Sequence, residues 1–116
     1  MSRSLRLLLL PAVLAMVVPF VVHAADTPAQ QGQTIAFDRT KGNCLACHTM
    51  RGSDVPSNVG PELTDLKSKY PNREDLVAIL QNEEARNPQT VMPLFGRNLI
   101  LTHDEIERVV DFLYTL

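Results

Sequence analysis

The chain has 116 residues, of which 45% are hydrophobic and 21% charged, and its formal net charge is −2 at pH 7. This length is sufficient for one domain. The slight acidic excess argues against a nucleic-acid-binding protein, because such proteins use Lys and Arg to neutralise phosphates. The chain has 2 Cys, no Trp and only 5% aromatic residues, so we expect its small core to need an additional stabilising component.

The first 24 residues have the three-part layout of a secretory signal peptide. Arg3 and Arg6 precede a mostly apolar run at residues 7–20, and a Val-x-Ala pattern stands just before Ala25. The alternative is an uncleaved anchor helix, but the apolar run is short and contains two prolines, which disfavour a stable membrane span. We therefore predict a cleaved signal peptide at 1–24 and an exported domain at 25–116, with no membrane span after cleavage.

The first part of the exported domain is predicted to hold one short helix. Residues 25–30 are polar and are expected to form a loose leader, and residues 31–40 are predicted to be helical. Gly32, Ile35, Ala36 and Phe37 would share one side of that helix. Residues 41–43 end it, and Gly42 is expected to supply an unusual backbone angle there.

Two further helices are predicted towards the C-terminus. Asn72 is a plausible cap for a helix at residues 73–84. Thr102 and Glu105 have the spacing of a capping box for a last helix, which is the clearest element in the sequence. The apolar residues of that helix recur at helical spacing and are Ile106, Val109, Val110, Leu113 and Tyr114. Strand signals are weak throughout, so the predicted fold class is all-α.

The segment Cys44-Leu45-Ala46-Cys47-His48 has the pattern of a covalent haem attachment site. Each of the two thiols can add across one vinyl group of a porphyrin. The histidine that follows then places an imidazole nitrogen on the iron. We therefore predict one covalently bound haem c, held by Cys44, Cys47 and His48.

Three other uses of these residues are a redox-active thiol pair, a zinc site and a disulfide. A redox-active CxxC needs a thiolate of low pKa, normally after a strand, and no strand-like run precedes Cys44. A structural zinc site needs four ligands, which Cys44, Cys47, His48 and His103 could supply, although neighbouring residues rarely both point at one metal. A disulfide between Cys44 and Cys47 would close almost no loop and would add little stability.

A haem bound through His48 has a second face that needs a ligand. Met50 is only two residues away and cannot reach round the macrocycle. His103 lies in the first turn of the last helix, where a solvated side chain is the simpler interpretation. Met92 lies in a Pro-braced loop, which suits a weak thioether ligand, so we predict Met92, although an ordinary packing role is the alternative for this residue.

Ligation of the iron by His48 and Met92 would leave no open position for oxygen, peroxide or substrate, so the implied chemistry is one-electron transfer. Iron-bound imidazoles normally donate their other N–H to a carbonyl or carboxylate. The carbonyl of Pro61, in the Gly-Pro turn of a rigid loop, is one candidate acceptor. The turn at Pro61 is equally consistent with a simple reversal of the chain.

These features together resemble the class I cytochromes c over essentially the whole exported domain. The resemblance includes a helix before the CxxCH motif, a Gly-Pro-x-Leu loop, a Met-Pro loop and an amphipathic last helix. It implies the class I cytochrome c fold, in which the first and last helices cross beside the haem. It also implies that Pro61 accepts the bond from His48 and that Met92 is the distal ligand.

A narrower resemblance is to SoxX, the small monohaem subunit of periplasmic SoxAX complexes. It rests on Phe37-Asp38 and on residues 42–48, 59–63, 92–96 and 100–116. It implies that this chain accepts electrons while a larger SoxA-like haem subunit joins thiosulfate oxidatively to a carrier-protein cysteine, an L-cysteine S-thiosulfotransferase reaction. Electrons would then pass to a soluble cytochrome. The motifs also fit a free-standing electron carrier, whereas Met92 argues against a peroxidase-like haem enzyme.

Overall fold

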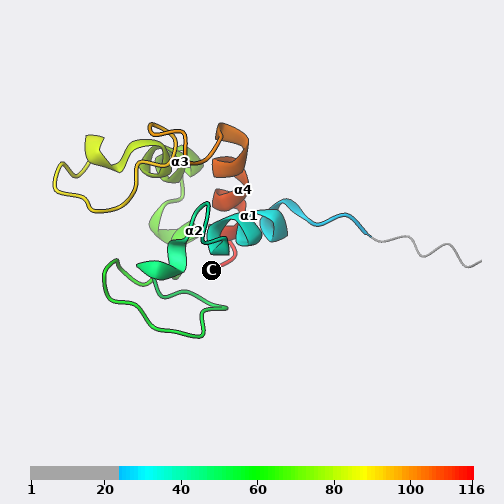
Figure 1. Ribbon diagram of the computed structural model, residues 1–116. Helices are drawn as coiled ribbons and strands as arrows, with labels where there is room; N and C mark the ends of the chain where they lie inside the picture. The colour runs from blue at the N-terminus through cyan, green and yellow to red at the C-terminus, as the bar shows by residue number, and fades with distance from the viewer. Residues whose placement is uncertain (1–23) are drawn as a thin grey trace, which may run out of the picture.

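The computed structural model describes residues 24–116, so the signal peptide predicted at 1–24 lies outside the described residues except for its last position. The described chain is made of short helices joined by long loops (Figure 1). The helices are α1 (Pro28–Phe37), η1 (Cys44–Ala46), α2 (Leu66–Lys69), α3 (Arg73–Asn82), η2 (Glu83–Ala85) and α4 (His103–Leu113). Within residues 24–116 the only β-type pairing is one isolated bridge between Met50 and Leu63. The all-α fold class is therefore confirmed.

Helix α1 begins three residues earlier than predicted and ends three residues earlier, so the prediction of a leader at 25–30 and a helix at 31–40 was wrong at both ends. Thr27 and Gln30 form a capping box, with Pro28 in the first turn where its missing N–H costs nothing. At the other end, the Asp38 side chain accepts the backbone N–H of Thr40, and this turn replaces a further turn of helix.

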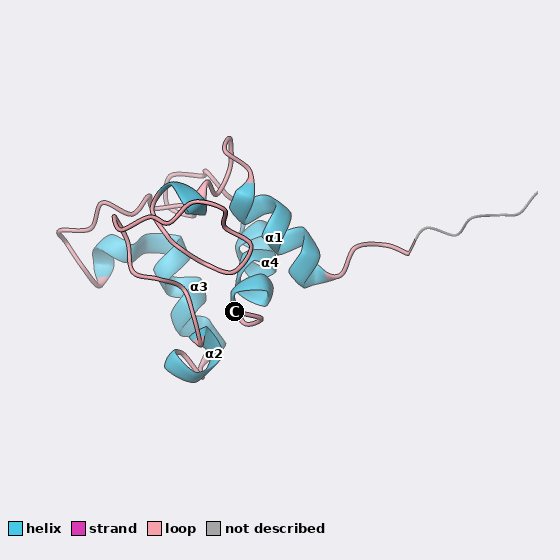
Figure 2. Cartoon of the chain, turned by 90° about the horizontal axis from the view of Figure 1, so that it is seen from below, coloured by secondary structure: helices cyan, strands magenta, loops and turns pink. Residues whose placement is uncertain are grey.

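Helices α1 and α4 cross at very close range, as the resemblance implied (Figure 2). A Cβ atom added at Gly32 would lie 1.8 Å from the carbonyl oxygen of Arg108, so only glycine allows the two backbones this approach. Beside the crossing, the rings of Phe37 and Phe112 meet edge to face, with centroids 5.7 Å apart. This crossing places the end of α1 and the segment after it against the rest of the core.

Helix α3 is anchored to α4 by one arginine at its start. Arg73 donates to the carboxylate of Glu107 at 2.8 Å and to its backbone carbonyl at 2.7 Å, and it pairs with Asp111 at 2.9 Å. Asn72 caps α3 as predicted, but α3 ends at Asn82 and continues as the 3-10 turn η2, so the predicted end at residue 84 was wrong. Helix α3 thereby forms the wall that faces the CxxCH segment.

Helix α4 confirms the clearest prediction from the sequence. Thr102 and Glu105 form the expected capping box. Its buried residues are Ile106, Val109, Val110, Phe112 and Leu113. Tyr114 is half-buried, and its hydroxyl donates to the carbonyl of Tyr70 at 2.7 Å. Within residues 24–116, no helix combines the length and the apolar character needed to cross a bilayer.

Candidate functional site

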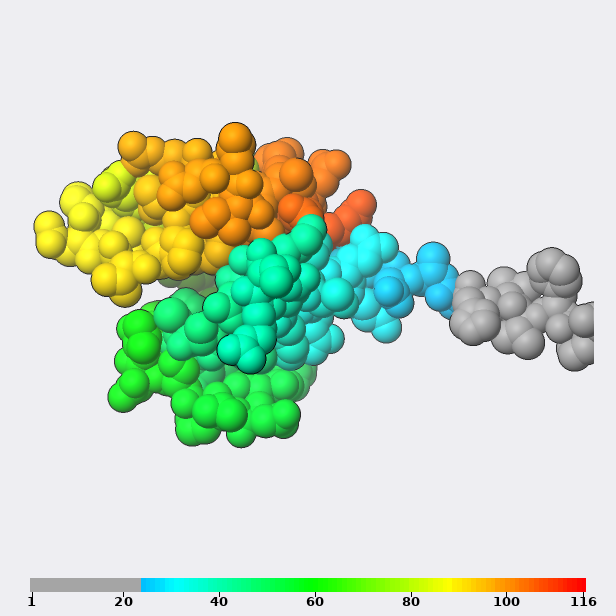
Figure 3. Space-filling view, viewed as in Figure 1, coloured from blue at the N-terminus to red at the C-terminus, as the bar shows by residue number. Residues whose placement is uncertain are grey.

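A cavity of about 590 Å³ lies between the CxxCH segment, helix α3 and the loop that contains Met92. Its mouth is visible in Figure 3 as a hollow between the green and yellow parts of the chain. The cavity is lined by all five residues that the sequence singled out, namely Cys44, Cys47, His48, Pro61 and Met92. Residues distant in sequence therefore converge on one space, whose remaining walls are largely apolar.

Cys44 is the first residue of the 3-10 turn η1, and Cys47 is the residue that directly follows this turn. The backbone of Asn43 is left-handed, with φ of 47°, and this turns the chain into η1. The expectation that Gly42 supplies the unusual angle was therefore wrong. Gly42 serves close packing instead, because a Cβ at that position would lie 2.8 Å from the carbonyl oxygen of Ile35.

The surroundings of the cysteines do not suit a redox-active thiol pair, a disulfide or a zinc site. Burial raises the pKa of the Cys44 thiol to about 11, the opposite of what a redox-active thiolate needs. Both cysteines are free, so they form no disulfide with each other. His103, the fourth ligand that zinc would need, is not among the residues that line the cavity.

His48 is held from two directions by the loop at residues 60–61. Its Nδ1 lies 2.7 Å from the carbonyl oxygen of Pro61. A carbonyl only accepts, so Nδ1 carries the proton and Nε2 keeps a free lone pair for a metal. Gly60 lies directly against the ring, because a Cβ there would be 2.5 Å from Cε1 of His48. The Gly60 N–H also donates to the carbonyl of Cys47 at 2.7 Å, which ties this loop to the motif.

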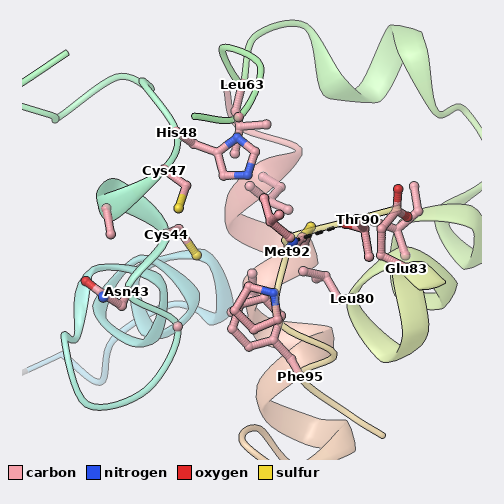
Figure 4. A pocket seen from close by; sticks show the side chains of 18 of the residues that line it. Asn43, Cys44, Cys47, His48, Leu63, Leu80, Glu83, Thr90, Met92 and Phe95 are labelled. Atoms are coloured by element: carbon pink, nitrogen blue, oxygen red, sulfur yellow. Dashed lines mark hydrogen bonds between the residues drawn. The ribbon is translucent and has the colours of Figure 1, made fainter. Parts of the chain in front are cut away.

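Met92 enters the cavity from a different part of the chain than His48 (Figure 4). Its backbone N–H donates to the hydroxyl of Thr90 at 3.0 Å, which fixes the start of the Met92 loop. The far end of the loop is tied to α3, because the N–H groups of Gly96 and Arg97 donate to the carbonyls of Leu80 and Gln81. The loop is therefore braced on both sides of the thioether.

Met50 and His103, the two alternatives to Met92 as the second iron ligand, both lie outside the cavity lining. Met50 is only 3% exposed within the core and does not line the cavity. The ring of His103 is exposed on the surface of α4, where its Nδ1 pairs with the side-chain amide of Gln81 at 3.2 Å. Of Met50, Met92 and His103, only Met92 lines the cavity together with His48.

The residues present fit a covalently attached haem. Two thiols and a correctly protonated imidazole come from one segment, a thioether comes from another, and the space between them has apolar walls. Two residues that help to build the site were not predicted from the sequence. The Thr90 hydroxyl stands two residues before Met92, a spacing typical of a side-chain turn, and the contact of Gly60 with the His48 ring had no sequence signal of its own.

Comparisons with known proteins agree with this arrangement. A family model described as Cytochrome c matches residues 29–116. The fold is similar to the crystal structure of SoxXA from P. pantotrophus, with a TM-score of 0.67, 25% sequence identity, and coverage of 84% of this chain and 88% of that chain. The comparison with curated proteins gave no significant match. The chain therefore belongs to the cytochrome c family, as a class I cytochrome c that resembles SoxX and carries covalently bound haem c as an electron carrier.

Proposed function

We propose that this chain is the electron-accepting subunit of a SoxAX-type complex, which joins thiosulfate oxidatively to a cysteine of a carrier protein. The observation that carries this proposal is the likeness to SoxXA, which extends over nearly the full length of both chains. In this role the chain has no substrate chemistry of its own. It takes electrons from a larger haem subunit and passes them to a soluble cytochrome.

We further propose that Cys44 and Cys47 attach the haem and that His48 and Met92 are its axial ligands. The protonated Nδ1 of His48 and the braced Met92 loop support this assignment. When bound, the haem supplies a one-electron couple between ferric and ferrous iron. Two protein ligands leave no iron position for a small substrate, and this restriction fits an electron-transfer subunit better than a peroxidase.

The proposed site of action is the periplasm, after cleavage of the signal peptide at residues 1–24. The sequence layout of that segment supports export. Covalent attachment through two thiols also requires a chain that is still accessible, as it is after export in the unfolded state. N-terminal sequencing of the purified protein tests this point, because the proposal requires a chain that starts near Ala25.

The rim of the cavity offers a surface for the larger subunit. Val59, Val91 and Ile100 line the cavity and are 60%, 80% and 39% exposed. Apolar side chains gathered at one opening are typical of a protein contact site. A partner seated there would lie next to the haem edge, where a short path for the electron is available.

The test is copurification of the full-length holoprotein with a SoxA-like subunit, using two matched valine variants. Val91→Asp places a charge at the rim, and Val55→Asp places one at a site that is also exposed, at 69%, but lies outside the cavity lining. We expect V91D to weaken the complex by at least about tenfold, which corresponds to roughly 1.4 kcal/mol, and V55D to leave it unchanged.

Two outcomes would contradict the proposal. One is reduction of this haem by thiosulfate at the same rate with and without the larger subunit. The other is a monodisperse monomer that does not bind a SoxA-like subunit, which would favour a free-standing electron carrier for another oxidase or dehydrogenase.

A further inference from the structure

One wall of the cavity carries an ion pair that the His48 and Met92 arrangement does not use. Glu83, the first residue of η2, has a side chain that is only 6% exposed. Arg86 donates to both of its carboxylate oxygens, from Nε at 3.1 Å and from a terminal nitrogen at 2.5 Å. Both residues line the cavity. A buried carboxylate is tolerated when it is paired and hydrogen-bonded, so each residue fixes the position of the other.

This ion pair lies across the cavity from the cysteines. Figure 4 shows the sulfur atoms of Cys44 and Cys47 on one side and Glu83 on the opposite side, with Met92 between them. In a haem, the two vinyl groups and the two propionates lie on opposite edges of the macrocycle. Attachment of the vinyl edge at Cys44 and Cys47 would therefore direct the propionate edge towards the side of the cavity that holds Glu83.

Arg86 has the capacity to bind a second carboxylate. A guanidinium has five N–H donors, and Glu83 engages two of them. The Arg86 side chain lines the cavity and is 62% exposed, so Glu83 leaves it room for a further partner. Arginine pairs with carboxylates through two parallel bonds, which gives such a contact both strength and a fixed orientation.

Within residues 24–116, the cations other than Arg86 that line the cavity lie on the cysteine side of it in the chain. Arg39 and Lys41 directly precede the CxxCH segment, and Lys41 is already paired with Glu105. Among residues 83–90, the polar lining residues are Glu83, Arg86, Asn87, Gln89 and Thr90. Arg86 is the only permanent cation in that group.

We propose that Arg86, held in place by Glu83, binds a haem propionate and thereby raises the reduction potential of the iron. A cation beside the propionate offsets its negative charge, and that charge would otherwise stabilise the ferric state. Glu83 acts through Arg86 and is a positioning residue. The proposal requires only the haem c of the family, so its failure would leave the partner subunit proposed above unaffected.

The experiment is a redox titration of the full-length holoprotein with arginine variants. Arg86→Gln removes the charge, Arg86→Lys keeps it, and Arg97→Gln is the matched control because Arg97 pairs with Glu84 outside the cavity lining. We expect R86Q to lower the midpoint potential, R86K to restore most of it, and R97Q to leave it unchanged. Equal midpoints for R86Q and R97Q would overturn the proposal.

Two further readouts keep the test decisive if R86Q accumulates poorly as holoprotein. The first is Glu83→Gln, which leaves the Arg86 cation in place but removes the carboxylate that holds it. The propionate bending mode in the resonance Raman spectrum of this variant should shift from that of the parent protein, and an unchanged band would overturn the proposal. Resonance Raman spectra of R86K and R97Q report on the propionate bending mode. That band should shift in R86K and not in R97Q, and no shift in either variant would also overturn it.

Discussion

His48 and Pro61 are joined by a bond of 2.7 Å between the imidazole Nδ1 and the proline carbonyl. This contact sets both the tautomer and the rotation of the ring, so the second nitrogen is ready to bind a metal before any metal arrives. Metal-binding histidines generally depend on such a partner. Gly60, the residue directly before this proline, lies against the same ring.

Replacement of Gly60 by alanine should displace the His48 ring. The new methyl group would lie within 2.5 Å of Cε1, and the imidazole would have to move away from the Pro61 carbonyl. We expect a smaller fraction of low-spin holoprotein in the absorption spectrum and a stability loss of about 1–3 kcal/mol.

Gly52→Ala is the matched control for Gly60→Ala. Gly52 has φ of 90°, so alanine is strained there too, but its neighbours are Gln33 and Phe37 rather than the cavity. The control should lose about 1 kcal/mol of stability with an unchanged haem spectrum. Identical spectra for the two variants would mean that Gly60 is not needed to position His48.

Met92→Ala should convert the ferric haem from six-coordinate to a high-spin form and should lower the reduction potential, because the thioether that favours ferrous iron is lost. Met50→Leu is the matched control, since Met50 is buried in the core and not in the cavity. That exchange nearly conserves volume and should cost less than about 1.5 kcal/mol. A low-spin M92A spectrum like that of the parent protein would remove Met92 from the iron.

Gly32→Ala should weaken the crossing of α1 and α4. The added methyl group would lie 1.8 Å from the carbonyl oxygen of Arg108, so the two helices must separate. We expect a loss of about 3 kcal/mol in the free energy of unfolding, measured with urea on the holoprotein. Thr34→Ala, at an exposed position on α1, should stay within about 0.5 kcal/mol of the parent. Equal losses in the two variants would contradict the close crossing.

The ion pair between Lys41 and Glu105 should make stability depend on pH in the acid range. The hydrogen bond from Lys41 is the main cause of a lowered pKa of Glu105, whose ordinary value is 4.5. A carboxylate with a lowered folded pKa stabilises the fold above its unfolded pKa, and this contribution is lost as the pH falls through the folded value.

Glu105→Gln tests this dependence while the capping box is kept, because the amide oxygen still accepts the Thr102 N–H. The variant should unfold at a lower urea concentration than the parent at pH 7, and the two midpoints should converge at an acid pH below the lowered pKa of Glu105. The difference at pH 7 should also shrink in high salt, since the pair is exposed. A gap of the same size at both pH values would show that the charge of Glu105 is not responsible.

Much of this arrangement was predictable from local sequence patterns. The CxxCH motif, the capping box at Thr102 and Glu105, and the helical spacing of α4 are local features, and each was placed correctly in the chain. The start of α1 was missed although it had a local signal, because Thr27, Pro28 and Gln30 together form an N-terminal cap. The polar composition of residues 25–30 obscures that signal.

Other features depend on contacts that no local pattern contains. The contact of Gly60 with the His48 ring, and that of Gly32 with Arg108, arise only when distant segments pack together. The position of Glu83 on the cavity wall is a similar case, since a Glu at the end of a helix usually indicates a solvated side chain. Its burial follows from the turn η2 and from its partner Arg86.

Electron paramagnetic resonance of the purified ferric holoprotein at neutral pH tests most directly whether the iron is closed on both faces. His48 and Met92 as the two ligands predict a low-spin spectrum in the unmodified protein, with a high-spin signal appearing only after Met92→Ala. A dominant high-spin, water-bound signal in the unmodified protein would contradict this coordination and would reopen the cavity to substrate chemistry.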